Sequence, residues 1–176
     1  MHFKILIFLF SFLYQNVTYS KANDANDFNQ KYLSNYFSAL VSFDNQKNDD
    51  AIKFFNSSKF LIKKHDNFLR HYVFSLILDG QVKKAINQIK HTKEANFFEA
   101  NLLIIIDSLT KKKYKQAENR ISKLLSYEND DTYKFAILKT LESYNYVFLN
   151  KKIGKKDGNL GRIDLITRAF QNCYLD

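Results

Sequence analysis

The sequence predicts an all-α fold, in which antiparallel helix pairs stack into a solenoid. Apolar residues recur at helical spacing, with no sustained alternation of apolar and polar residues. The chain has 176 residues, of which none is proline and four are glycine, so it lacks the turn residues that β-sandwiches and barrels need. An apolar content of 45% suffices for one domain with a core, and an aromatic content of 16% excludes a disordered chain.

The first 22 residues have the pattern of an export signal. A short basic start, Met1 to Lys4, precedes a mostly apolar run from Ile5 to Tyr14. That run is about half of the roughly 20 residues needed to span a membrane, which argues against a membrane anchor. Small residues at Ser20 and Ala22 predict cleavage between Ala22 and Asn23, although an uncleaved signal acting as a weak anchor stays open. We therefore expect an exported protein, in the periplasm or cell envelope of a Gram-negative bacterium, with residues 23–30 as a disordered lead.

Successive apolar stripes predict the helices of the mature chain. Seven stripes fall within a predicted repeat domain spanning residues 31–150, over 33–43, 51–55, 68–77, 82–89, 97–109, 114–125 and 132–150. Connections this short make consecutive helices pack as antiparallel neighbours.

Polar residues mark where several of these helices begin and end. Short polar side chains at residues 48–50, 66–67 and 130–131 precede three of the stripes and can cap free backbone N–H groups. Gly80 follows the third stripe, and glycine readily adopts the left-handed conformation that ends a helix.

Three helix pairs share a pattern that recurs at nearly constant spacing. An alanine lies in the first turn of the second helix of each pair: Ala51, Ala85 and Ala117. A large apolar residue follows four positions after each alanine: Phe55, Ile89 and Ile121. The alanine fits because helices whose axes approach to about 8–10 Å need a small side chain at the contact.

This pattern resembles the tetratricopeptide repeat, a helix–turn–helix unit of about 34 residues. The best match is Phe68 to His91, which has the family's turn glycine at Gly80. The first unit carries Gln46 at the turn and the third carries Lys112, and the family's proline and tryptophan are absent. The resemblance covers roughly Tyr32 to Leu125. It implies a right-handed superhelix of about three repeats, whose concave groove binds a peptide or helix of a partner protein.

In such a superhelix, the first helix of each pair lines the groove. We expect exposed polar residues of those helices to contact the partner. The candidate groove residues are Asn35, Arg70, His71, Asn101 and Asp107.

Residues 151–176 differ in composition from the repeats before them. Three of the four glycines lie there among four lysines, which predicts a basic loop leading to an amphipathic helix over 163–175. The whole chain resembles the beginning of larger exported repeat proteins of proteobacteria, which implies a short or truncated form and makes this helix part of a further repeat. No later helix covers its apolar face, so we expect self-association or partner binding there. The candidate association face consists of Ile163, Ile166, Phe170 and Tyr174.

The sequence contains no recognisable catalytic or metal-binding constellation. His65, His71 and His91 lack the i, i+4 spacing of a zinc protease motif, and no glycine-rich phosphate loop occurs. Cys173 lies on the predicted apolar face, where we expect a small buried hydrophobe; if exposed in an oxidising compartment, it would instead link two chains. We expect no enzymatic activity, no cofactor and no metal.

The net charge of +9 at pH 7 favours an anionic partner, such as nucleic acid, an anionic membrane surface or an acidic protein segment. Export argues against nucleic acid, because nucleic acid is not the usual ligand outside the cytoplasm. We therefore expect a non-catalytic exported scaffold that binds a protein or peptide. The alternative is a peripheral envelope-membrane protein, held on an anionic surface by an uncleaved signal and the lysine-rich tail.

Overall fold

The computed structural model describes residues 29–65, 67–92, 95–127, 132–154 and 160–176. In these residues the regular secondary structure is entirely helical, which confirms the predicted all-α class. The predicted signal, with its cleavage site at Ala22 and Asn23, lies outside the described residues, as do the expected caps at 66 and 130–131.

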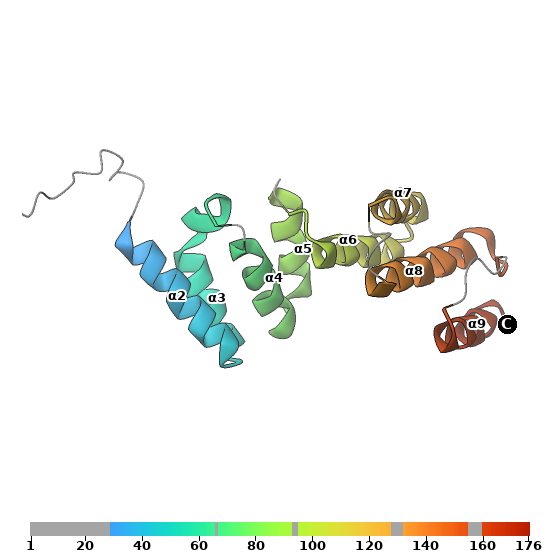
Figure 1. The fold of residues 1–176 in the computed structure, drawn as a ribbon, viewed down its shortest axis with the longest axis horizontal. Coiled ribbons are helices and arrows are strands. Elements are labelled where there is room, and N and C mark those ends of the chain that lie inside the picture. Colours follow the sequence, from blue (N-terminus) through green and yellow to red (C-terminus); the bar gives the residue numbers. More distant parts are fainter. Residues whose placement is uncertain (1–28, 66, 93–94, 128–131, 155–159) are drawn as a thin grey trace, which may run out of the picture.

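The described part contains eight α-helices in a row (Figure 1). They are α2 (Gln30–Asp44), α3 (Asn48–Ser57), α4 (Phe68–Leu78), α5 (Val82–His91), α6 (Phe98–Thr110), α7 (Tyr114–Leu125), α8 (Thr132–Asn150) and α9 (Arg162–Leu175), with a 3-10 helix over Lys59–Lys63. Each helix packs mainly against the helices before and after it in the chain. None of these helices is long and apolar enough to cross a membrane.

The same turn joins α2 to α3, α4 to α5 and α6 to α7. The residue at its centre has a positive φ in each case: 61° at Gln46, 76° at Gly80 and 57° at Lys112. The following backbone N–H then donates to a carbonyl five residues earlier: Lys47 to Ser42 (2.9 Å), Gln81 to Leu76 (2.7 Å) and Lys113 to Ser108 (2.8 Å). This is the hydrogen bond of a Schellman motif, which closes a helix. The three turn positions are therefore equivalent, although glycine occupies one of them.

The residues that define the repeat pattern lie in the apolar core. Ala51, Ala85 and Ala117 have no exposed surface, and the large apolar residues four positions later are buried: Phe55, Ile89 and Ile121. One cluster of buried residues extends from α2 into α6, and a second joins α6, α7 and α8. The elongated row is thus held together by neighbour-to-neighbour packing.

Candidate functional site

A groove of about 1060 Å³ is bounded by α5, α6 and α7. Asn101, Ile104 and Ser108 of α6 line it, because residues three and four apart share one face of a helix. Asp107 also lines it, so the structure brings together two of the five candidate groove residues, Asn101 and Asp107. The second helices, α5 and α7, supply most of the remaining wall.

Asp107 ties α5 to α6 at the edge of this groove. Its carboxylate accepts hydrogen bonds from Lys111, directly after α6, at 2.6 Å and from Lys90 of α5 at 2.7 Å. The hydrogen bonds from these two lysines, led by that from Lys111, hold the pKa of Asp107 below its ordinary value against the opposing effect of burial. The negative charge of Asp107 is therefore already compensated within the chain.

Asn101 is buried, at 7% exposure, so the prediction that its side chain is exposed is wrong. Its Oδ1 accepts a hydrogen bond from Arg120 Nη1 of α7 at 2.7 Å, and its Nδ2 donates to the Phe97 carbonyl at 3.1 Å. α7 packs on α6 and covers this side chain. The hydrogen bond from Arg120 to Asn101 holds Arg120 at the groove.

The groove carries an excess of positive charge. Its described lining contains one acidic residue, Asp107, and four basic ones: Lys90, Lys113, Arg120 and Lys123. Lys113 and Lys123 have no ion-pair partner among the described residues. The exposed side-chain amides of Asn96, Gln116 and Asn119 line the same surface and make no hydrogen bond within the described part. These groups are available to bind an anionic partner.

Sequence reasoning missed the contribution of α7. Four of its residues, Gln116, Asn119, Arg120 and Lys123, recur at spacings of three and four and form one polar face. That periodicity is visible in the sequence, but the tetratricopeptide resemblance predicts a groove lined by the first helix of each pair, and α7 is a second helix.

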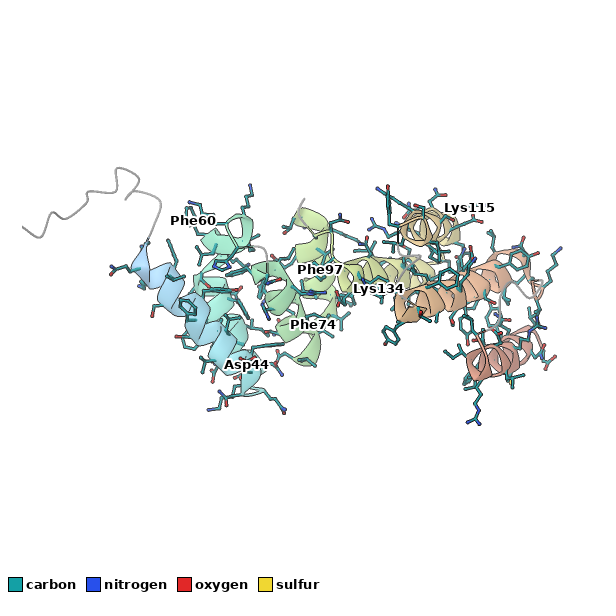
Figure 2. All side chains as sticks on the ribbon, in the orientation of Figure 1. Asp44, Phe60, Phe74, Phe97, Lys115 and Lys134 are labelled. Atoms are coloured by element: carbon teal, nitrogen blue, oxygen red, sulfur yellow. The ribbon has the colours of Figure 1, made fainter. Side chains whose placement is uncertain are left out.

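Arg70 and His71 of α4 do not line the groove, and neither does Asn35 of α2. Arg70 Nη2 lies 2.9 Å from both carboxylate oxygens of Glu99, which joins α4 to α6. Its guanidinium also lies 5.7 Å from the ring centroid of Phe97, which is labelled in Figure 2. Burial raises the pKa of Glu99, but the hydrogen bonds and charge of Arg70 outweigh it, so that the pKa lies below its ordinary value.

His71 contacts the residue before α4 and an aromatic ring of α2. Its Nδ1 lies 2.9 Å from the Asn67 carbonyl oxygen, and its ring packs edge-on against Phe43 with centroids 5.6 Å apart. Among the described residues, no group of three or more His, Cys, Asp or Glu side chains is placed to hold a metal ion.

The four candidate residues of the association face are exposed on α9. Ile163, Ile166, Phe170 and Tyr174 have exposures between 45% and 62%. The buried residues of α9 are instead Thr167 and Gln171. Cys173 is also exposed, so the expectation of a buried cysteine is wrong: this helix turns its polar face inward.

Comparison with protein-family models, with curated proteins and with solved structures gave no match to this chain. The resemblance to tetratricopeptide repeats therefore depends on the residues of the chain itself.

Proposed function

We propose that this chain is a non-catalytic, exported scaffold of tetratricopeptide-like repeats that binds a partner protein through the α5–α7 groove. The partner contributes an extended acidic segment. Several features of the fold support the repeat architecture: the three equivalent turns at Gln46, Gly80 and Lys112, and the buried alanine that follows each of them.

The positive charge of the groove is the observation that favours an acidic partner. Lys113 and Lys123 have no compensating acid among the described residues, and Arg120 is held at the groove by Asn101. Carboxylates of a partner would pair with these cations. The free side-chain amides of Gln116 and Asn119 can both donate to and accept from the main chain of an extended peptide. At about 1060 Å³ the groove is at the upper limit of the roughly 300–1,000 Å³ typical of small-molecule pockets, which suits a stretch of polypeptide.

Binding of a labelled decaglutamate peptide, followed by fluorescence anisotropy, tests the chemistry of the groove. The double variant Lys113→Glu/Lys123→Glu should weaken binding about tenfold or more, since it replaces two attractive contacts by repulsive ones. The control Lys83→Glu/Lys84→Glu makes the same change of charge on exposed residues of α5 outside the groove. Equal loss in both variants would show that only the net charge matters.

Photo-crosslinking in the native envelope tests the location. Tyr127 lines the groove and Tyr133 does not, yet both are 74% exposed. A photoreactive residue at position 127 should capture a protein that the same residue at position 133 does not. Capture of lipid alone at position 127 would contradict the proposal.

A peripheral association with the envelope membrane is the second candidate, and the exposed apolar face of α9 favours it. Lys151, Lys152 and Arg162 are exposed close to that face in the sequence, and anionic lipid attracts such residues. Cell fractionation with N-terminal sequencing separates the two proposals. A chain that begins at Asn23 and is free of the membrane fraction supports the scaffold.

A further inference from the structure

The exposed apolar residues of α9 have the spacing of a coiled-coil seam. The a and d positions of two heptads, at intervals of three, four and three residues, are filled by Ile163, Ile166, Phe170 and Cys173. All four side chains of this seam are exposed. Among the described residues α9 packs mainly against α8, at the end of the row of helices in Figure 1. No seam residue lines the α5–α7 groove, so the inference is independent of the proposed groove.

The residues that flank the seam differ on its two sides. On the side toward α8 they are Thr167, which is buried, and Tyr174, whose ring packs against an aromatic ring of α8. On the open side they are Arg162, Ala169 and Asp176, which are exposed. Arg162 and Asp176 make no ion pair within the described part. The open side therefore has a cation at one end of α9, an anion at the other end and a small residue between them.

Two α9 helices that run in opposite directions match along this seam. In an antiparallel pair related by a twofold axis, an a position of one helix packs against a d position of the other. Ile163 then meets Cys173 of the second copy, and Ile166 meets Phe170 of the second copy. Cys173 is thereby covered by an aliphatic side chain, which suits a cysteine that acts as a small hydrophobe.

The charges on the open side favour this antiparallel direction. The twofold axis places Arg162 of each copy opposite Asp176 of the other, so that two ion pairs form. It also places the two Ala169 residues face to face, where small side chains allow the helices to approach closely. In a parallel pair, Arg162 would instead face Thr167, which is uncharged and buried.

We propose that a second copy of this chain covers the apolar face of α9, in an antiparallel, twofold-symmetric pair of α9 helices with an Arg162–Asp176 ion pair at each end. Burial of the apolar seam drives the association. The seam spans only two heptads, and small interfaces are characteristic of transient complexes. The dimer therefore forms and dissociates with changes in protein concentration.

Charge reversal, followed by sedimentation equilibrium, tests the ion pairs. Arg162→Asp and Asp176→Arg should each raise the dimer dissociation constant about fivefold or more, because each replaces two attractions by two repulsions. Both changes suit the dipole of α9, so fraying of the helix does not account for weaker association. The double variant Arg162→Asp/Asp176→Arg restores opposite charges and should recover the dissociation constant of the parent. Lys83→Asp, on an exposed position of α5, makes the same change of net charge as Arg162→Asp and should have no effect. A double variant that associates no more tightly than the single variants would overturn the proposed pairing.

Disulfide cross-linking tests the direction of the helices. Under oxidation by copper phenanthroline, Ile163→Cys should form a covalent dimer through Cys173 of the second copy. The variant Ile163→Cys/Cys173→Ser and the parent, which has one cysteine, should stay uncross-linked, because no two cysteines then face each other. Rapid cross-linking of the parent would place the two Cys173 residues face to face and overturn the antiparallel arrangement. A parent that stays monomeric while it binds vesicles of anionic lipid would assign this face to the membrane, and a parent that stays monomeric without binding vesicles would exclude a second copy; either result overturns the proposal.

Discussion

Replacing Lys112 by glycine should stabilise the protein, although lysine is the better helix former. Lys112 has a φ of 57°, and an L-residue in the left-handed region loses about 1–2 kcal/mol. Glycine avoids that loss, but it makes the unfolded chain more flexible, at a cost of about 0.4–1 kcal/mol. The Lys112 side chain is exposed and makes no ion pair within the described part, so the substitution removes no such contact. The expected net gain is about 0.5–1 kcal/mol.

The same reasoning predicts the opposite sign at Gly80. Its φ is 76°, and a Cβ added there would meet no atom within 4 Å. Gly80→Ala therefore tests backbone conformation without steric overlap, and we expect a loss of about 0.5–1 kcal/mol. Gln46→Gly, at a φ of 61°, is an independent repeat of the Lys112 experiment.

Thermal unfolding followed by circular dichroism measures these differences. For a chain of this length, 1 kcal/mol shifts Tm by about 2–4 °C. Lys123→Gly is the matched control, because Lys123 lies within α7 at an exposed position, where glycine should lower stability by about 1 kcal/mol. If Lys112→Gly lowers Tm as Lys123→Gly does, the equivalence of the three turns does not govern their stability and the reasoning is wrong.

Three further predictions concern packing, pH and association. Ala85→Phe should destabilise the fold by about 1–3 kcal/mol through overpacking, whereas Asn87→Phe on the exposed side of α5 should change the free energy of unfolding by less than about 0.5 kcal/mol; equal Tm values would contradict this. Because the pKa of Asp107 is lowered by folding, its contribution to stability is present above its ordinary pKa, near 4, and is lost as pH falls through the folded pKa. Urea unfolding as a function of pH should therefore show less acid destabilisation in Asp107→Asn than in the parent, and parallel curves would refute the assignment. Ile166→Ser/Phe170→Ser should shift the chain toward monomer in light scattering, whereas a parent that is monomeric at high concentration would rule out self-association through α9.

The positions of the helices could be predicted because their signals are local. The stripe over 114–125 corresponds to α7 at Tyr114–Leu125, and the stripe over 82–89 falls short of the end of α5 at His91 by two residues. The turns could also be predicted from the sequence. The spacing of the repeats aligns Lys112 and Gln46 with Gly80, and all three residues have a positive φ. Periodicity depends on neighbours within a few residues, which the sequence displays directly. The expected caps at residues 48–50 and 67 are wrong, because α3 already begins at Asn48 and Asn67 makes no side-chain capping hydrogen bond.

The candidate site was predicted less well because exposure depends on which helix covers which face. Asp107 and Asn101 were correctly placed on one helix, but nothing local shows that Arg120, 19 residues later, would bind Asn101. Lys113 and Lys123 were missed for the same reason. Whether a lysine is free to bind a partner depends on whether the fold brings an acidic side chain next to it, and among the described residues none pairs with these two.

The orientation of α9 is the feature that apolar periodicity in the sequence predicts least well. An apolar stripe on a helix is ordinarily assigned to the core, since burial of each large apolar side chain contributes about 1.5–3 kcal/mol. In α9 the stripe containing Ile166 and Phe170 faces solvent, and the buried positions are Thr167 and Gln171. The helix therefore forgoes apolar burial on one face and has an unsatisfied carboxamide oxygen on the other. A partner on the outer face would offset the first of these costs. Because Ile166→Ser/Phe170→Ser alters only the outer face and Gln171→Leu only the inner one, the two surfaces can be tested separately on a single helix.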